Sequence, residues 1–256
     1  MPAEPPGPIR SRAGLRRVAC SPPEAVAEGV WLLRGGLART MNVYLLRDEA
    51  TGAVVVFDAG EKGMAGSIAA AAAALGGISR VVLSHADTDH RGAAPALRAL
   101  AEVHCHPDAV EQAQGSGGRD YWRPQQLPPD VRLLHGFLHR FVWDGGPVQI
   151  DGTVREGDVV AGFDVVELAG HAPGLIGLWR ERDGVALVSD CIYMTDMYGK
   201  PQAPAVPIDA YNLDTTRARA AVAKLAGLRP KVVWPGHRGP LTGPDVVQRL
   251  EAAATG

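Results

Sequence analysis

Four potential metal ligands lie within six residues of one short segment of the chain, residues 81–92. Residues 81–83 are apolar and mostly β-branched, which favours a buried strand that ends just before the ligands. A loop that leaves such a strand can direct several side chains to one point. Imidazole and carboxylate groups suit zinc, iron and manganese. The segment therefore predicts a metal centre, and its candidate ligands are His85, Asp87, Asp89 and His90.

Three further candidates lie downstream, each beside small or turn-forming residues. His171 lies in a Gly-His-Ala-Pro-Gly segment, Asp190 follows Val-Ala-Leu-Val-Ser at 185–189, and His237 follows Trp-Pro-Gly. These settings are typical of loops at strand ends, where side chains from distant parts of a chain can meet.

In their order and spacing, these residues resemble the metallo-β-lactamase fold superfamily. The signature of that family is His-x-His-x-Asp-His, then a His in a Gly-His-Ser/Thr-Pro-Gly turn, an Asp at a strand end, and a final Gly-His. The resemblance runs from about Val30 to Gly239. The chain differs at one position, because Asp87 stands where the family has its second histidine and makes the motif His-x-Asp-x-Asp-His.

The resemblance implies an α/β (α+β) fold, a four-layer αββα sandwich of two mixed β-sheets flanked by helices. The ligands would meet along one edge of the sheets. Hydrophobic patterning predicts strands at 30–33, 41–46, 54–57, 80–84, 102–105, 148–150, 158–160, 164–168, 175–179, 185–189 and 231–234. It predicts helices at 64–75, 93–100, 107–114, 215–225 and 244–253.

Residues 1–24, rich in Pro and Arg, are expected to form a flexible leader, and residues 25–256 a single domain. The domain has an irregular insertion at about 115–147, where glycines and prolines alternate with aromatic residues. Insertions at this point of the family often form part of the rim over the metal site. The segment is therefore either a partial lid that shapes the substrate pocket or a surface excursion that packs on its own small core.

The roles of the candidate residues follow from the resemblance. One metal would be held by His85, Asp87 and His171, and a second by Asp89, His90 and His237, with Asp190 bridging both. Asp87 is either a ligand or a partner that orients a histidine. Asp58, in a family-like Asp-x-Gly, is not counted as a ligand. The expected cofactors are two divalent ions, zinc in preference, with iron or manganese possible beside Asp87.

Asp89 and Tyr193 are the candidate catalytic residues. Acyl-homoserine lactone lactonases of the superfamily place a tyrosine similarly to Tyr193, where its hydroxyl contacts the substrate carbonyl. The alternative is that Tyr193 is a packed residue of the pocket wall. The other histidines are assigned to surface or packing, and they are His104, His106, His135 and His139.

Asp87 changes the charge of the expected centre. Two divalent cations (+4), three carboxylates (−3: Asp87, Asp89, Asp190) and a hydroxide (−1) sum to zero, whereas a histidine at 87 would leave +1. We therefore expect a metal-dependent hydrolase whose metal-bound hydroxide cleaves a small ester, lactone or thioester, with a bias toward neutral substrates. The alternatives are an enzyme similar to mononuclear iron persulfide dioxygenases and a catalytically degraded metal- or ligand-binding protein.

Composition limits the other possibilities. A net charge of −2 gives no electrostatic case for nucleic-acid binding. No apolar run reaches the length of a membrane span. Three cysteines, a sparse and odd number, favour a reducing compartment, so the cytoplasm is expected. The expected partner is a small-molecule substrate, with neither nucleic acid nor membrane.

Overall fold

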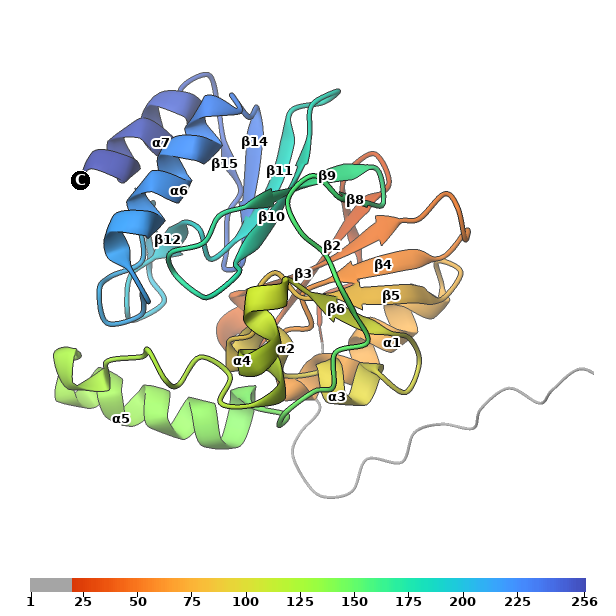
Figure 1. Cartoon of the computed structure of the whole chain (residues 1–256), viewed down its shortest axis with the longest axis horizontal. Helices are drawn as coiled ribbons and strands as arrows, with labels where there is room; N and C mark the ends of the chain where they lie inside the picture. Colours follow the sequence, from red (N-terminus) through yellow and green to blue (C-terminus); the bar gives the residue numbers. More distant parts are fainter. Residues whose placement is uncertain (1–19) are drawn as a thin grey trace, which may run out of the picture.

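The computed structural model describes residues 20–256 and contains two β-sheets packed face to face (Figure 1). The first sheet has the strand order β1-β2-β3-β4-β5-β6-β7. Neighbouring strands are antiparallel from β1 to β4 and parallel from β4 to β7. Its strands are β1 (Glu24–Ala27), β2 (Val30–Gly35), β3 (Met41–Arg47), β4 (Val54–Phe57), β5 (Ile78–Val82), β6 (Val103–Cys105) and β7 (Gly152–Thr153).

The second sheet has the order β15-β14-β11-β10-β9-β8. Only its β11–β14 pair is parallel. Its strands are β8 (Val159–Val160), β9 (Phe163–Glu167), β10 (Ile176–Arg180), β11 (Val185–Ser189), β14 (Val232–Pro235) and β15 (Leu241–Thr242). A separate two-stranded ribbon joins β12 (Tyr193–Thr195) to β13 (Pro201–Ala205).

The helices are α1 (Ala65–Ala73), α2 (Thr88–Arg91), α3 (Ala94–Leu97), α4 (Val110–Gln114), α5 (Pro129–Leu138), α6 (Thr215–Gly227) and α7 (Val246–Thr255). The alanine-rich sequence of α1 favours a helix, and the chain leaves it through Gly76 and Gly77, both at positive φ. The Asp214 side chain caps α6 by accepting a hydrogen bond from the Arg217 amide. Among residues 20–256, no helix combines the length and the apolar character needed to cross a bilayer.

Three buried apolar layers hold these elements together. Side chains such as Phe57 of the first sheet and Leu178 of the second meet between the sheets. Helices α1, α3 and α4 cover the outer face of the first sheet, and α6 and α7 cover that of the second. Two mixed sheets between helical layers are the αββα sandwich that the sequence predicted, so this prediction is confirmed.

Several local predictions were wrong. Residues 148–150, predicted as a strand, have no regular structure, and β7 follows them. The helix predicted at 93–100 is confined to α3, because the amides of Ala99 and Leu100 bond to carbonyls three residues back and close the helix as a turn. The segment 115–147 is not irregular throughout, since it contains α5 and a π-helical turn, His139–Trp143.

The expected leader lies mostly outside the described residues, which begin at Cys20. The residues that follow it attach to the first sheet and to α1. The Cys20 amide donates to Ser67 Oγ at 3.3 Å, and the Ser21 amide donates to the Arg34 carbonyl at 2.7 Å.

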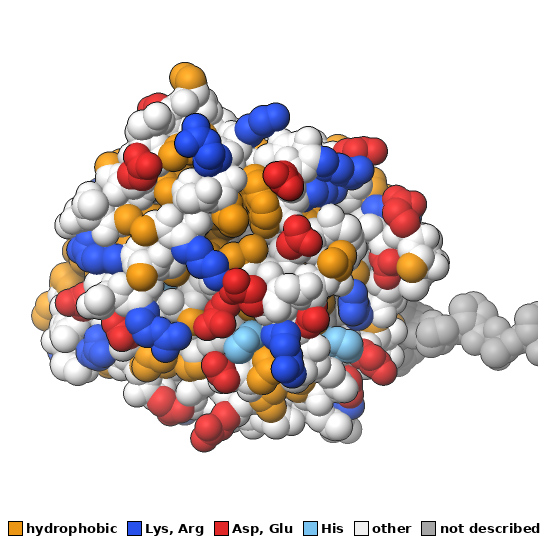
Figure 2. Space-filling model, turned by 45° about the horizontal axis from the view of Figure 1, so that its top comes forward, with side chains coloured by type: hydrophobic (Ala, Val, Ile, Leu, Met, Phe, Trp, Pro, Cys, Tyr) orange, Lys and Arg blue, Asp and Glu red, His pale blue; other side chains and the backbone are white. Residues whose placement is uncertain are grey.

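The described Lys and Arg side chains are interspersed with Asp and Glu on the face that Figure 2 shows. This face has no broad stripe of one sign, in keeping with the net charge of −2. It therefore offers no basic track of the kind that follows a phosphate backbone.

Candidate metal centre

The predicted ligands come from loops at the carboxyl ends of strands. His85 and Asp87 follow β5, and Asp89 and His90 lie in the short helix α2. Asp190 follows β11, His237 follows β14, and His171 lies in the connection between β9 and β10. Because these strand ends share one edge of the sandwich, the structure brings all seven predicted residues together. The seven are His85, Asp87, Asp89, His90, His171, Asp190 and His237.

The first group contains His85, Asp87 and His171, whose ligand atoms all lie within 4.8 Å of one another. Asp87 Oδ2 is 3.8 Å from His85 Nε2 and 3.4 Å from His171 Nε2. The two histidines are buried, and Asp87 is half-buried at the edge of a pocket.

The second group contains Asp89, His90 and His237. His237 Nε2 is 3.5 Å from Asp89 Oδ2 and 3.4 Å from His90 Nε2. His90 is fully buried, whereas Asp89 and His237 are half-buried and line the same pocket.

Asp190 lies between the two groups. Its Oδ1 is 3.2 Å from His90 Nε2, and its Oδ2 is 3.4 Å from His237 Nε2 and 3.8 Å from His171 Nε2. Because Oδ2 lies between a histidine of each group, this carboxylate can serve two cations at once.

The outer nitrogens of three histidines are held by neighbouring groups. His90 Nδ1 is 3.0 Å from Asp58 Oδ2, His85 Nδ1 is 2.8 Å from Ser84 Oγ, and His171 Nδ1 is 3.2 Å from Asn212 Oδ1. Such contacts fix the ring orientation and direct Nε2 toward the centre. Asp58 therefore supports the centre from behind, and its Oδ2 also accepts from Ser84 and Ser189.

The backbone at two of these supports is strained. Asp58 has φ 62° and Ser189 has φ 46°, a region that non-glycine residues seldom adopt. Both follow or end a strand, where this geometry turns their side chains toward His90.

The loop that carries His237 is fastened to β3 of the other sheet. Asn42 Nδ2 donates to the carbonyls of Pro235 and Arg238 at 2.8 and 2.6 Å, and the Tyr44 hydroxyl donates to Pro235 at 2.7 Å. Gly236 lies so close to Asp190 and His90 that a Cβ would collide with both. The Gly-His pair is therefore required by close packing at the centre.

Buried polar atoms without partners mark where a cation would be held. His85 Nε2, His171 Nε2 and Asp190 Oδ1 are buried and have no hydrogen-bond partner among the described residues. Such atoms are costly to bury unless something else satisfies them. Ligands about 2.1 Å from one ion lie roughly 3.4 Å apart in tetrahedral geometry, which matches the separations here. These residues therefore fit divalent metals.

The protonation states of one histidine and two carboxylates suit cation binding. Burial, reinforced by repulsion from His90, lowers the pKa of His85 to about 4, so its imidazole is neutral at pH 7. Burial alone would raise the pKa of Asp87, but the close polar contact with His171 and the charges of His85 and His171 outweigh it and lower the pKa to about 2. Burial likewise opposes ionisation of Asp190, yet His90 and His237 hold its pKa well below the usual range. For the other histidines, His90, His171 and His237, neighbouring carboxylates outweigh burial and raise the pKa, so a cation must displace a proton there.

Tyr121 contacts Asp87, and nothing in the sequence indicated this contact. The buried hydroxyl of Tyr121 donates to Asp87 Oδ1, while Oδ2 of the same carboxylate faces His85 and His171. Gly118, at φ 83°, lies against the same oxygen and has no room for a Cβ. The insertion thus holds the carboxylate that replaces the histidine of the family motif.

We expect Tyr121→Phe to weaken metal binding at the first group by about 10-fold, because partners that orient ligands typically contribute this much to affinity. The measurement is a zinc titration of metal-free protein against a competing chelator. Tyr198→Phe is the control, since the Tyr198 side chain is 55% exposed. Equal affinities in both variants and the wild type would remove the role assigned to Tyr121.

Arg91, buried in α2 beside His90, fastens both ends of the insertion. Its guanidinium donates to the carbonyls of Gln112 and Ala113 at 2.6 Å and to Gly115 at 3.1 Å, and it lies 3.5 Å from Asp144 Oδ1. The insertion therefore packs directly on the ligand-bearing helix. It also shares a small core with Ala210, made by Leu127 and Val131.

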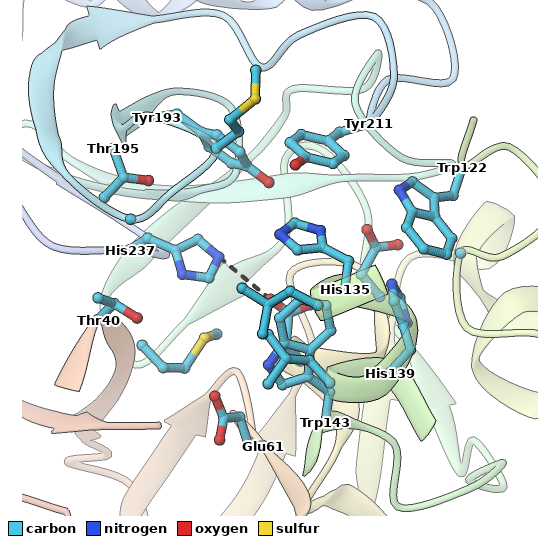
Figure 3. Close-up of a pocket in the computed structure, with 18 of the residues that line it drawn as sticks. Thr40, Glu61, Trp122, His135, His139, Trp143, Tyr193, Thr195, Tyr211 and His237 are labelled. Atoms are coloured by element: carbon cyan, nitrogen blue, oxygen red, sulfur yellow. Dashed lines mark ion pairs between the residues drawn. The ribbon is translucent and has the colours of Figure 1, made fainter. Parts of the chain in front are cut away.

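A pocket of about 260 Å³ opens over the centre. Tyr193 lines it, and its hydroxyl donates to Asp190 Oδ2 at 2.9 Å. In Figure 3, His237 and Tyr193 lie near Thr40 and Thr195, and the insertion contributes the opposite side. The insertion therefore shapes the pocket as well as packing on its own small core.

Two histidines assigned to surface or packing, His135 and His139, belong to that opposite side of the pocket. They recur with Trp143 at four-residue spacing, a helical signal that could have grouped them. The other two are remote from the pocket: His104 contacts Glu102, and His106 accepts from the Asp108 amide.

The family model of the metallo-beta-lactamase superfamily matches residues 38–237. A probable metallo-hydrolase of Bacillus subtilis, YflN, is 27% identical over 250 residues, which cover 92% of this chain and 90% of the relative. A metallo-beta-lactamase family protein from Thermus thermophilus, TTHA1429, is 25% identical with a TM-score of 0.65, over 90% of this chain and 80% of its own. The mono-zinc form of the metallo-beta-lactamase FIM-1 from Pseudomonas aeruginosa shares the fold at 15% identity, with a TM-score of 0.67 over 94% and 97% of the two chains. The chain belongs to the metallo-beta-lactamase superfamily and is a metallo-hydrolase of that family.

Proposed function

We propose that the chain hydrolyses a small neutral ester, lactone or thioester with two divalent cations, zinc in preference. The observation that carries the proposal is the convergence of four imidazoles and two further carboxylates around Asp190 at the base of a small pocket. When bound, the metals would supply an activated water and would polarise the carbonyl oxygen of the substrate.

The residues of the chain have separate tasks in this proposal. His85, Asp87 and His171 hold one cation, Asp89, His90 and His237 hold the other, and Asp190 serves both. Asp89 faces the pocket beside His237, where its carboxylate can accept and pass on the proton of the attacking water. The Tyr193 hydroxyl lies at the pocket surface of Asp190 and can turn to donate to the substrate carbonyl.

The charge around the pocket supports a neutral substrate. Among the described residues that line it, the sole Lys or Arg is Arg238, and its guanidinium donates to the Gly199 carbonyl at 2.7 and 3.0 Å. Two further acidic residues, Glu61 and Asp196, line the pocket away from the metal centre. An anionic substrate would therefore meet two cations already balanced by carboxylates and further repulsion outside them.

The test is a panel of alkyl esters, lactones, a thioester and a phosphodiester, assayed with zinc-loaded protein and with chelator-treated protein as the control. We expect an uncharged carbonyl substrate to exceed the phosphodiester in kcat/KM by about 100-fold, because one unit of charge near the reacting atoms contributes a few kcal/mol at most. Preference for the phosphodiester, or oxygen uptake with a thiol persulfide in place of hydrolysis, would overturn the proposal. Elemental analysis of protein purified without added metal identifies the ions.

A further inference from the structure

One side of the pocket is a continuous surface of rings, which we call the aromatic wall: Trp122, His135, His139, Trp143 and Tyr211. Four of these residues belong to the insertion 115–147, and Tyr211 precedes α6. In Figure 3 the aromatic wall lies across from Thr40 and Thr195, with His237 between the two sides. A substrate over the metal centre would thus have the aromatic wall on one side and polar groups on the other.

The rings of the aromatic wall support one another. Trp122 and His139 have centroids 4.6 Å apart, and His139 and Trp143 are 4.8 Å apart. His135 lies nearly parallel to Tyr211, at 13° and 5.6 Å. The spacing is too small to admit another ring between them, so a ligand would lie against the aromatic wall.

The aromatic wall lines the pocket with rings. The indole nitrogen of Trp122 and the hydroxyl oxygen of Tyr211 are both buried and have no hydrogen-bond partner among the described residues. Leu134 and Leu138 of α5 line the pocket beside them. These surfaces gain most from contact with an apolar, planar partner, because aromatic pairs attract beyond the effect of their buried area.

The aromatic wall is also uncharged near neutral pH. Burial, with a contribution from His139, lowers the pKa of His135 to about 4, and burial lowers that of His139 as well. His139 Nδ1 is further held by a 2.8 Å hydrogen bond with Thr88 Oγ1. The acidic residues that line the pocket away from the metal centre, Glu61 and Asp196, come from outside the insertion.

We propose that the aromatic wall is a subsite for an uncharged, planar aromatic group, so that the preferred substrate carries an aryl group next to its scissile ester, lactone or thioester carbonyl. This inference rests on the proposed hydrolysis at the metal centre. The volume of the pocket, about 260 Å³, lies just below the range of about 300 to 1000 Å³ for sites of drug-sized ligands, so it suits a small substrate with one ring plus the reacting group.

The test compares three methyl esters that differ in the acyl group: methyl phenylacetate, methyl cyclohexylacetate and methyl acetate. Acid release by zinc-loaded protein is followed by titration at constant pH. We expect kcat/KM for the phenyl ester to exceed that of the acetate by about 10- to 100-fold, and that of the cyclohexyl ester by a smaller factor. Trp122→Leu should remove most of this preference, and Trp122→Phe, which keeps a ring, should retain most of it. Trp31→Leu, on β2 outside the pocket, is the matched control and should keep the full preference.

A second measurement needs no turnover. Phenylacetamide is added to chelator-treated wild-type protein and its binding is followed by tryptophan fluorescence, with cyclohexylacetamide as the comparison. Tighter binding of the phenyl compound supports the subsite, and it does so even if every ester is inert, in which case only the proposed hydrolysis fails. Equal rates for the three esters, together with equal binding of the two amides, would overturn the subsite and leave the hydrolysis standing.

Discussion

Asp190→Asn is expected to reduce the metal content of the protein from two ions per chain to one or none and to lower hydrolysis by about 1000-fold or more. Among the seven predicted ligands, Asp190 is the carboxylate whose oxygens approach histidines of both groups, at 3.2 Å from His90 Nε2 and 3.8 Å from His171 Nε2. The amide keeps the shape of the side chain but loses the negative charge between the two cations. Losing an activated water and a polarised carbonyl removes several kcal/mol of transition-state stabilisation, and each 1.4 kcal/mol is about tenfold in rate.

The measurement is elemental analysis after exhaustive dialysis, with kcat/KM on the best substrate of the panel. Asp164→Asn is the control, because Asp164 is an exposed carboxylate on β9, away from the pocket. The side-chain amide introduced by Asp190→Asn can still accept the Tyr193 hydrogen bond through its oxygen, so the metal-free variant should unfold near the wild-type temperature. Two ions and wild-type turnover in Asp190→Asn would contradict the bridging role.

The sandwich was predictable from the sequence because its central strands carry clear local signals. Residues 185–188 are apolar and begin and end with valine, and the strand predicted at 185–189 coincides with β11. The convergence of the candidate ligands was predictable for a related reason, since each follows such a strand or lies in a glycine-rich turn. That they fall into two groups joined by Asp190 came from the family resemblance, and the local sequence alone does not specify it.

The insertion was not predictable in the same way. Helix α5 has apolar residues on both of its sides: Val131 and Leu138 are buried, while Leu133 and Phe137 are 77% and 54% exposed. This distribution hides the helical period, and the flanking prolines suggest irregular structure.

Residues 148–150 show the opposite error, because regular structure was predicted where there is none. Their sequence predicted a strand, but only the Val148 amide bonds to a neighbouring segment, at the Ala113 carbonyl.

The contact between Tyr121 and Asp87 could not be predicted from the sequence. Tyr121 is one aromatic residue in a segment without periodicity, 34 positions from Asp87. Nothing near either residue signals the contact, which depends on how Arg91 holds the ends of the insertion. The sequence shows the aspartate at position 87, but it does not show that the Tyr121 hydroxyl donates a hydrogen bond to that aspartate.

Asp87→Asn is expected to remove one metal site and leave the other. Asp87 is the one carboxylate of the first group, where its oxygen lies within 4.8 Å of the ligand atoms of His85 and His171. The second group has its own carboxylate, Asp89, and also contacts Asp190. We therefore expect zinc titration of the metal-free variant to change from two binding steps to one. Hydrolysis should fall by about 100-fold, equivalent to about 2.7 kcal/mol in the barrier. Asp164→Asn, the exposed control, should keep both steps.

Asp87→His provides the sharper comparison, because it restores the histidine of the family motif. An imidazole is longer than a carboxylate, and the space beyond Asp87 Oδ1 is filled by Tyr121 and by Gly118, which has no room even for a Cβ. The variant should therefore also show one binding step, and the double variant Asp87→His with Tyr121→Ala should recover the second by opening that space. Two steps in Asp87→Asn with wild-type affinities would show that Asp87 orients a histidine and binds no metal. Two steps in Asp87→His alone would show that the insertion yields to a larger side chain, and that the carboxylate at position 87 is not enforced by packing.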